Sequence, residues 1–391
     1  MDTDRALRRV ADRLPRARTG CVFSHGNGQG VVGGLRDIYT GNACAVYEWC
    51  VDAGLDAVWL HASRRLRGVR GTAHGFRSVQ GAVASMRARV SMGGSNNGAP
   101  SGYLSDRTWV VQGWHGTPLK RIGRAAAAGG DPRGARLVER ADFFLSPGQE
   151  FSTRFARCYD VRPEQFWTLG NPRNDVLVRA DAAATRVRQE QLRAALRPVD
   201  VDRVILYAPT WRDWRSAPDF LPAPDRDLGR LDRWLRERNE VLVLRAHQLE
   251  ARHALALTAS YERIVVSDSL DLPWDVSDWC LAADLLVTDY SSVFYDYLLL
   301  DRPVVHLAPD LQEYADRRGF LVDPLSDFAG PVAATQSELL NALEDGLDHP
   351  EREASVRARL NRLHNPLEDG ASTERVGRAL LGLLDRPRDA A

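Results

Sequence analysis

The sequence predicts an α/β protein with two domains, each built around a parallel sheet. Two observations favour this fold class. The chain has 391 residues, more than twice a typical domain of roughly 150 residues. Short apolar strand-like runs alternate with helix-like runs in both halves of the chain, as in parallel sheets whose strands are joined by helices.

The composition is that of an ordinary globular protein. Hydrophobic residues make up 44% and charged residues 27%, which excludes a disordered or collagen-like chain. Lys plus Arg and Asp plus Glu both number 52, so the formal net charge is zero. Because no overall basic field is present, we expect no nucleic-acid partner.

Two features indicate a cytoplasmic protein. No apolar run approaches the roughly 18 residues that span a bilayer, and the start, MDTDRALRRVADRL, contains no apolar signal core. The five cysteines are widely spaced and include no CxxC pair, which favours reduced thiols in or near the core over a disulfide framework or a zinc site.

The first predicted element is a basic amphipathic helix at 2–18. Leu7, Val10 and Leu14 fall on one face, and arginines surround that face. Such a helix can lie on a membrane surface or pack on its own domain. We favour packing on its own domain.

A strand at 21–24 leads into the glycine-rich loop HGNGQGVVGG. Gly28, Gly30 and Gly33 match the GxGxxG pattern of dinucleotide-binding turns, and Asp52 stands where a ribose-binding acid would. The segment that follows, LRDIYTGN, is a poor helix start because its last two residues, Gly and Asn, interrupt it. We therefore favour a mobile glycine loop over a nicotinamide site.

The remaining elements of the first half follow in order. We predict a helix at 43–51, strands at 57–61, 108–112, 143–147 and 166–169, and a flexible loop at 91–102. A polar helix at 185–197 then precedes a second strand–helix alternation. The predicted domains are therefore 1–185 and 186–365, with a C-terminal helix in 366–391 that can pack back on the first domain.

The second half repeats the alternation of the first. We predict strands at 204–208, 241–245, 263–266, 284–288 and 303–307, and helices at 228–238, 250–259, 292–300, 351–364 and 372–384.

Five polar clusters each follow the end of a predicted strand. In open parallel sheets, ligands bind beyond the carboxyl ends of the strands, so the five clusters are best considered together. They occupy residues 112–120, 170–175, 207–213, 245–247 and 288–293.

The first cluster contains a candidate general base, His115. It follows Trp114 and precedes Gly116, Thr117 and a proline, so a tight turn holds it where no neighbouring Cβ blocks a substrate. Histidine is the side chain best suited to accept a proton near neutral pH. A structural histidine in a turn is the alternative. Lys120, the only lysine of the chain, lies in the same motif.

The next three clusters offer cationic groups. Arg173 in a rigid turn can steer an anionic substrate, or it is a solvated arginine in an Asx-type turn. Trp211 and Arg212 can cover a nucleotide and its phosphates, or they are a buried tryptophan and a surface ion pair. Arg245 and His247 lie two apart at a strand end, so they point the same way and suit negative charge on phosphate.

The fifth cluster, Thr288-Asp289-Tyr290-Ser291-Ser292, joins a strand to a helix. Hydroxyls and backbone N–H groups meet there at a helix N-terminus, which favours an anion. Asp289 or Ser291 acting as a plain N-cap is the alternative. The sequence contains no HExxH and no Cys/His cluster. We therefore expect a cleft that handles a nucleotide diphosphate without an obligatory metal, and no cofactor.

With these clusters in this order, the sequence resembles the CDP-glycerol glycerophosphotransferase family of teichoic-acid and capsule synthesis. The resemblance runs from about residue 22 to about residue 340 and depends on WHGTPLKRIG, GNPRNDVL, ILYAPTWRD, RAH and ADLLVTDYSSVFYDYLLLDRPVVHL. It implies a GT-B architecture, in which two Rossmann-like domains face each other across a cleft. The first domain would meet the acceptor and the second would hold CDP-glycerol. The implied reaction transfers glycerol phosphate to an acceptor hydroxyl and releases CMP.

The resemblance also implies roles for residues that match the family's motifs. His115 would be the general base on the acceptor hydroxyl. His247 would stabilise the donor phosphates or act as the acid for the leaving CMP. Asp289 would fix its turn, and Lys120 would orient the His115 loop or meet phosphate. The other implied substrate-binding residues are Gly116, Thr117, Arg173, Thr210, Arg212, Arg245, Thr288, Ser291 and Ser292.

Two departures from the family's pattern bear on the acceptor. Gln248 stands where the family usually has proline, and Asn171 stands where an aromatic residue is usual. A CDP-ribitol or other polyol-phosphate donor, a GT-B nucleotide-sugar glycosyltransferase and a non-enzymatic scaffold remain as alternatives. Because acceptors of this family are usually lipid-linked, the helix at 2–18 is the candidate for peripheral contact with the inner face of the cell membrane.

Overall fold

The structure is a computed structural model of the chain. It describes residues 3–17, 20–25, 39–61, 68–94, 103–126, 140–197, 199–212, 214, 220–246, 251–270, 272 and 274–388. The predicted glycine loop with Gly28, Gly30 and Gly33 lies outside these residues. So do His247 and Gln248.

The chain divides into two compact units. The first comprises Met1–His115, Ile122–Asp175 and Pro366–Ala391, and the second comprises Gly116–Arg121 and Val176–Asn365. The path therefore passes from one unit to the other four times, after His115, Arg121, Asp175 and Asn365.

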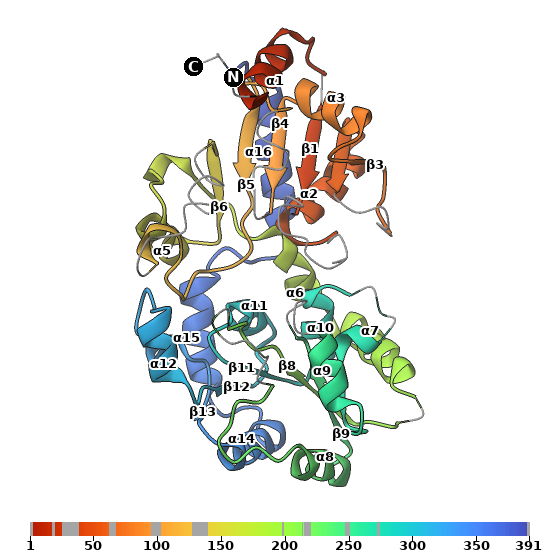
Figure 1. Ribbon diagram of the computed structural model, residues 1–391, viewed down its shortest axis with the longest axis vertical. Helices are drawn as coiled ribbons and strands as arrows, with labels where there is room; N and C mark the ends of the chain where they lie inside the picture. The colour runs from red at the N-terminus through yellow and green to blue at the C-terminus, as the bar shows by residue number, and fades with distance from the viewer. Residues whose placement is uncertain are drawn as a thin grey trace. The chain divides into compact units, whose positions relative to one another are not determined.

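The first unit is built on a parallel sheet that has seven strands within the described residues, in the order β3-β2-β1-β4-β5-β6-β7. Its labelled strands follow one another across the view in Figure 1 as β6, β5, β4, β1 and β3. Cys21 of β1 lies between Ala57 of β2 and Val90 of β4. This is the doubly wound order of nucleotide-binding folds, extended by one strand. The strands are β1 Cys21–Ser24, β2 Ala57–His61, β3 Thr72–Gly75, β4 Val90–Gly93, β5 Trp109–Gln112, β6 Phe143–Ser146 and β7 Phe166–Thr168.

The prediction of a flexible loop from residue 91 is wrong for Ser91–Gly93, which belong to β4. This strand is short and ends on a glycine pair, so its sequence resembles a loop. Pairing with β1 on one side and β5 on the other makes it a fully buried central strand.

Helices cover the first sheet on both faces. The C-terminal helix α16 packs against α2, where the indole Nε1 of Trp49 donates to Glu374 at 2.6 Å. A Cβ on Gly377 would lie 2.4 Å from the Trp49 ring, so glycine permits this close approach. The longer helices of this unit are α1 Thr3–Arg13, α2 Gly41–Asp52, α3 Val79–Arg87, α5 Gln149–Cys158 and α16 Ser372–Leu384.

The segment containing α1 is fixed to the first unit by polar contacts. Asp12 Oδ1 accepts from Ser105 Oγ at 2.5 Å and from the Asp106 N–H at 3.0 Å. Arg16 donates to the carbonyl oxygens of Met86 and Ala88 at 3.1 and 2.8 Å. The helix therefore packs on its own unit.

The second unit has a parallel sheet of six strands within the described residues, in the order β10-β9-β8-β11-β12-β13. Leu286 of β11 lies between Leu206 of β8 and Val304 of β12. Numbered within the unit, this is again the doubly wound order. The strands are β8 Arg203–Tyr207, β9 Glu240–Leu244, β10 Ile264–Val266, β11 Leu285–Thr288, β12 Val304–Leu307 and β13 Val332–Ala333.

Capping residues begin several helices of the second unit. Thr335 and Glu338 form a reciprocal capping box at the start of α14. The predicted helix at 292–300 is α11 followed by a 3₁₀ turn at Leu298–Leu300. The α-helices from the boundary at Asp175 to the end of the second unit are α6 Asp175–Arg179, α7 Ala182–Ala195, α8 Leu228–Glu237, α9 Ala251–Thr258, α10 Val276–Ala282, α11 Val293–Tyr297, α12 Leu311–Arg317, α13 Pro324–Asp327, α14 Gln336–Asp348 and α15 Ala354–His364.

Two predictions from the sequence concern the cysteines and membrane-spanning helices. All five cysteine side chains are buried and none forms a disulfide, as predicted. Among the described helices, none has the combination of length and apolar character that crossing a bilayer requires.

Candidate functional sites in the two units

Both sheets have a switch point, where the strand order reverses: between β1 and β4, and between β8 and β11. Ligands of doubly wound sheets bind outside the carboxyl ends of strands at such points. The clusters at 207–213 and 288–293 follow β8 and β11, the two strands of the second switch point. The cluster at 112–120 follows β5, the neighbour of β4.

His115 lies on a sharply turned backbone in the first unit. Trp114 has φ +51° and Gly116 has φ +148°, both outside the region that ordinary residues favour. A non-glycine residue in that region costs about 1–3 kcal/mol. The Trp114 N–H donates to Gln112 Oε1 at 3.1 Å, and the indole is 4.8 Å from the Phe155 ring centroid.

This turn leaves the imidazole of His115 exposed while its neighbour is buried. The ring stacks on the Trp114 indole, with centroids 4.4 Å apart and planes 27° apart. The side chain is therefore accessible to a substrate, yet it rests on a buried aromatic surface that limits its rotation.

Asn42 connects the two polar clusters of the first unit. Its Nδ2 donates to the Gly113 carbonyl at 2.7 Å and to Asn171 Oδ1 at 3.2 Å, and its Oδ1 accepts from the Arg173 N–H at 3.1 Å. Asn42 lies in the first turn of α2, which begins at Gly41, two residues before the start predicted at 43. The departure at Asn171 thus has a structural partner.

The GNPRND turn supports both His115 and α16. Arg173 Nη1 donates to the His115 carbonyl at 2.5 Å. Asp175 accepts from the N–H groups of Ser372 and Thr373 at 2.9 and 2.8 Å, at the start of α16. A Cβ on Gly170, which has φ +91°, would lie 2.1 Å from the Ser372 hydroxyl, so the turn requires glycine.

Lys120 and Thr117 belong to the second unit, although His115 belongs to the first. Lys120 forms an antiparallel bridge with Phe320, and the Leu119 carbonyl accepts from the N–H of the residue after Phe320 at 2.9 Å. Thr117 is buried and Lys120 is half-buried. Gly116, the first residue of this segment, adopts φ +148°.

Asp289 ties together the ends of the two switch-point strands in the second unit. Its carboxylate accepts from the Thr210 N–H at 2.9 Å and from the Tyr290 N–H at 2.5 Å. It also forms an ion pair with Arg212. These three contacts hold the loop after β8 against the turn after β11.

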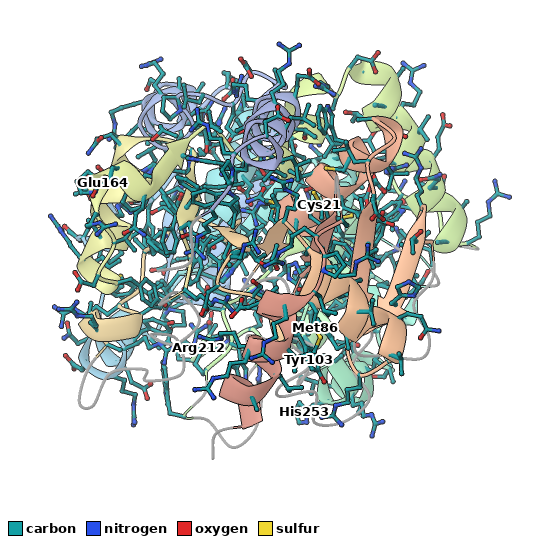
Figure 2. All side chains as sticks on the ribbon, turned by 90° about the horizontal axis from the view of Figure 1, so that it is seen from above. Cys21, Met86, Tyr103, Glu164, Arg212 and His253 are labelled. Carbon is teal, nitrogen blue, oxygen red and sulfur yellow. The ribbon has the colours of Figure 1, made fainter. Side chains whose placement is uncertain are left out.

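Arg212 is buried between two carboxylates. Its Nε and Nη2 donate to Asp310 at 3.1 and 3.0 Å, and its guanidinium lies over the rings of Tyr290 and Tyr314. Burial alone would lower the pKa of Arg212, but Asp289 and Asp310 outweigh burial and raise that pKa. Figure 2 labels Arg212 among the side chains.

The alternative of a buried Trp211 and a surface ion pair is wrong in both parts. Trp211 is 39% exposed, whereas the ion pairs of Arg212 with Asp289 and Asp310 are buried. The predicted contact between Arg212 and phosphates stays a prediction.

His306 was missed by the sequence analysis, which treated it as part of a strand. Its Nε2 accepts from the Ala329 N–H at 3.1 Å, so Nδ1 carries the proton and donates to the Asp289 carbonyl at 3.1 Å. Burial lowers the pKa of His306 to about 4. The neutral ring stacks on Phe328, with centroids 4.0 Å apart.

The remaining predicted donor-site residues differ in exposure. Thr288 is fully buried, and its hydroxyl donates to the Ala208 carbonyl at 2.7 Å, so it belongs to the sheet's core. Ser291 and Ser292 are half-buried at the start of α11, and Ser292 forms no side-chain cap. Arg245 follows β9 and is half-buried.

Two kinds of site considered from the sequence, a metal site and a dinucleotide site, can be compared with the described residues. Within these ranges no group of three or more His, Cys, Asp and Glu side chains is arranged to hold a metal ion. Asp52, the predicted ribose-binding acid, is the last residue of α2 and pairs with Arg70 at 2.6 Å.

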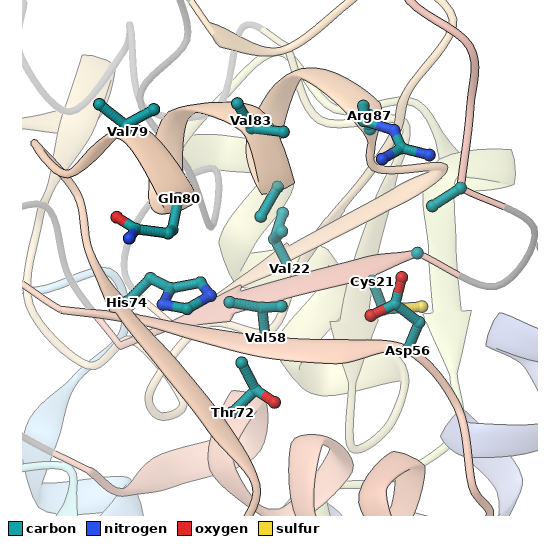
Figure 3. A pocket seen from close by; sticks show the side chains of 13 residues that line it. Cys21, Val22, Asp56, Val58, Thr72, His74, Val79, Gln80, Val83 and Arg87 are labelled. Carbon is teal, nitrogen blue, oxygen red and sulfur yellow. The ribbon is translucent and has the colours of Figure 1, made fainter.

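A cavity of about 420 Å³ in the first unit contains none of the predicted site residues. It lies between α3 and the strands β1, β2 and β3, with valines of both layers facing it (Figure 3). Its lining consists of Ala17, Gly20, Cys21, Val22, Asp56, Val58, Thr72, His74, Val79, Gln80, Val83, Ala84 and Arg87.

Comparison with known sequences identifies relatives of the chain. The family described as CDP-Glycerol:Poly(glycerophosphate) glycerophosphotransferase matches residues 36–382. A teichoic acid glycerol-phosphate transferase of Staphylococcus aureus is 31% identical over 286 residues, covering 70% of this chain and 71% of the relative. The teichoic acid ribitol-phosphate polymerase TarK of the same organism is 30% identical and aligned over 68% of this chain, but over only 51% of its own length.

Solved structures show the same fold. A variant of the wall teichoic acid polymerase TagF, with one histidine replaced by alanine, superposes with a TM-score of 0.79 and 25% identity. The match covers 97% of this chain and 93% of that chain. The α/β fold with two parallel sheets is therefore that of this polymerase.

Proposed function

Since the chain belongs to the CDP-glycerol:poly(glycerophosphate) glycerophosphotransferase family, we propose that it transfers glycerol phosphate from CDP-glycerol to an acceptor hydroxyl and releases CMP. The observation that carries this proposal is the family match across both units, together with the predicted motifs at the carboxyl ends of the strands. Catalysis would use the two units as the halves of a GT-B cleft, with the acceptor on the first and the donor on the second.

His115 would act as the general base on the acceptor hydroxyl. Its imidazole is exposed, and the strained turn and the Trp114 indole hold it in place. A positioned base contributes typically 10²–10⁴-fold to rate. The hydroxyl oxygen would attack the phosphorus that carries glycerol, and the bond from that phosphorus to the CMP oxygen would break.

The second unit would hold the donor's phosphates at its switch point. Ser291 and Ser292 supply hydroxyls at the start of α11, and Thr210 and Arg245 follow the neighbouring strands β8 and β9. The buried contacts of Asp289 support this proposal, because they fix the turn that would face the phosphates. His247 would stabilise charge on the leaving CMP.

The acceptor would be a teichoic-acid-like polymer or its lipid-linked primer. Helix α1 packs on its unit, yet Arg9, Val10 and Arg13 on its outer side are exposed. A surface with both arginine and an apolar side chain suits the interface of an anionic bilayer. We propose that it makes the peripheral membrane contact.

A second donor, CDP-ribitol, is favoured by one observation: a relative of 30% identity is a ribitol-phosphate polymerase. The test incubates the protein with CDP-glycerol or CDP-ribitol and a panel of acceptors, and follows CMP release and product mass. We expect CMP release and mass increments of glycerol phosphate. Increments of ribitol phosphate alone would replace the donor assignment, and no CMP release from either would overturn the proposal.

A further inference from the structure

The side chain of Asn42 is fully buried and bonded to both polar turns of the first unit. We infer that Asn42 is a positioning residue for His115, so that its amide sets the placement of the imidazole. This inference rests on the proposed role of His115 as the general base. It goes beyond the proposed function because it assigns a positioning role to Asn42, which is not among the residues proposed to bind or react with a substrate.

The amide of Asn42 uses both its donors and its acceptor. Nδ2 donates to the Gly113 carbonyl, to Asn171 Oδ1 and, at 3.5 Å, to the Trp114 carbonyl, and Oδ1 accepts from the Arg173 N–H. Aspartate has the same shape but no donor, and serine lacks the reach. Asparagine therefore suits this place through its size and its two kinds of polar atom.

These bonds support the backbone around His115 at two places. On one side, Gly113 lies two residues before His115, and its carbonyl is held at 2.7 Å by Asn42. On the other, the backbone of Arg173 is held by Asn42 while its guanidinium donates to the His115 carbonyl at 2.5 Å. One buried amide thus fixes both supports of the turn.

The turn needs such support because Trp114 adopts φ +51°, a conformation that non-glycine residues disfavour. Without the amide, the Gly113 carbonyl and the Arg173 N–H would each lose a buried partner. Relaxation of Trp114 toward an ordinary backbone conformation would then remove the His115 ring from the indole on which it stacks.

The effect on the reaction follows from geometry alone. Asn42 does not present a group to the substrate, because it is fully buried. It acts through the position of the base, and a misplacement of about 1 Å can lower a rate by about 100-fold. Donor binding, which the proposal places in the other unit, should stay unchanged.

The experiment compares Asn42→Ala and Asn42→Asp with the unchanged protein. Asn42→Asp keeps the size and the acceptor but removes both donors. Ser85→Ala is the matched control, since Ser85 is equally buried and donates one bond, to the Gly81 carbonyl at 2.7 Å, away from the turn. Thermal unfolding confirms that each variant is folded.

Two readouts report positioning. The first is steady-state transfer from CDP-glycerol, which should show kcat lower by about 100-fold and the donor KM within about threefold. The second is the imidazole proton resonance of His115, assigned by its loss in His115→Ala. Stacking on Trp114 displaces this resonance, and we expect both Asn42 variants to move it toward the position of free histidine while Ser85→Ala leaves it unmoved.

A folded Asn42 variant whose His115 resonance does not move overturns the inference, and so does one whose kcat stays within threefold while His115→Ala is inactive. If both Asn42 variants fail to fold, the residue supports the core rather than the turn, and the inference is likewise rejected. If His115→Ala keeps full turnover, the base assignment fails instead, while the resonance still reports whether Asn42 positions the ring.

Discussion

The guanidinium of Arg173 donates to the backbone carbonyl of His115 at 2.5 Å. These residues are 58 positions apart in the sequence and come from two different motifs. The arginine, predicted to steer an anion, therefore also supports the peptide that carries the candidate base. The pair joins the two polar turns of the first unit into one hydrogen-bonded structure.

Replacing His115 by alanine should abolish transfer while leaving the affinity for CDP-glycerol within about a factor of ten, because a base on the acceptor contributes mainly to the transition state. Steady-state CMP release and calorimetric titration with CDP-glycerol measure the two quantities. His253→Ala, which removes an exposed histidine of α9, serves as the control and should retain turnover. A parallel collapse of binding and rate would contradict the assignment.

Replacing Ser291 and Ser292 together by alanine should weaken CDP-glycerol binding by about 1–3 kcal/mol, the range for hydrogen bonds to charged oxygens. Both hydroxyls are half-buried at the start of α11. Calorimetric titration gives the donor affinity, and Ser326→Ala on the exposed surface of α13 is the control. Unchanged donor affinity in the double variant would remove the phosphate site from this turn.

Arg212→Met should lower the free energy of unfolding by about 3–5 kcal/mol, because it leaves the buried carboxylates of Asp289 and Asp310 without their partner. Urea unfolding measures the change. Arg317→Met provides the comparison: its ion pair with Glu313 is exposed, so the loss should be below about 1 kcal/mol. Equal losses in the two variants would show that burial of the Arg212 ion pairs adds nothing to the free energy of unfolding.

His306 should make the folded protein less stable in acid. Its pKa is about 4 when folded, against 6.5 ordinarily, so between these values the unfolded chain binds the extra proton. Its contribution is therefore full above pH 6.5 and falls as the pH is lowered. From pH 7 to pH 5 the loss is about 2 kcal/mol.

His306→Phe tests this pH dependence. Phenylalanine keeps the stack on Phe328 but cannot take up a proton. Urea unfolding at pH 7 and pH 5 should therefore show a pH dependence smaller by about 2 kcal/mol in the variant. The same pH dependence in both proteins would assign the acid sensitivity to other groups.

Membrane contact through α1 predicts a charge dependence. Arg9→Glu combined with Arg13→Glu should reduce sedimentation with vesicles that contain anionic phosphatidylserine, since each basic residue near such a surface contributes about 1 kcal/mol. Both side chains are exposed. Vesicles of phosphatidylcholine alone provide the comparison, and equal sedimentation of variant and parent would exclude α1 as the contact.

Local patterns were sufficient to predict much of the fold. The strand at 57–61 and the helix at 372–384 were predicted with the bounds that the structure shows. Apolar runs and helical periodicity are properties of neighbouring residues, so they can be recognised in the sequence. The parallel character of both sheets also follows from the repeated strand–helix pattern, whereas the order of their strands was not predicted.

Contacts between distant residues could not be predicted in this way. Asn42 meets Gly113 and Arg173 across 71 and 131 positions, and nothing in the helix that contains it indicates these partners. His306 was hidden for a related reason, because one buried polar residue in an apolar strand does not reveal which backbone atom it will bind. That Gly116–Arg121 belongs to the second unit could not be predicted either, because it depends on pairing with a segment about 200 residues later.

The membership of α16 in the first unit has a consequence for how the protein is made. Val376, Leu380, Leu383 and Leu384 complete an apolar core whose other buried members lie between Cys21 and Leu145. During synthesis, that core stays open until the ribosome has added these residues, whereas the second unit's strands have already emerged. A premature stop codon before residue 372 should therefore expose the oldest part of the nascent polypeptide to chaperones and proteases.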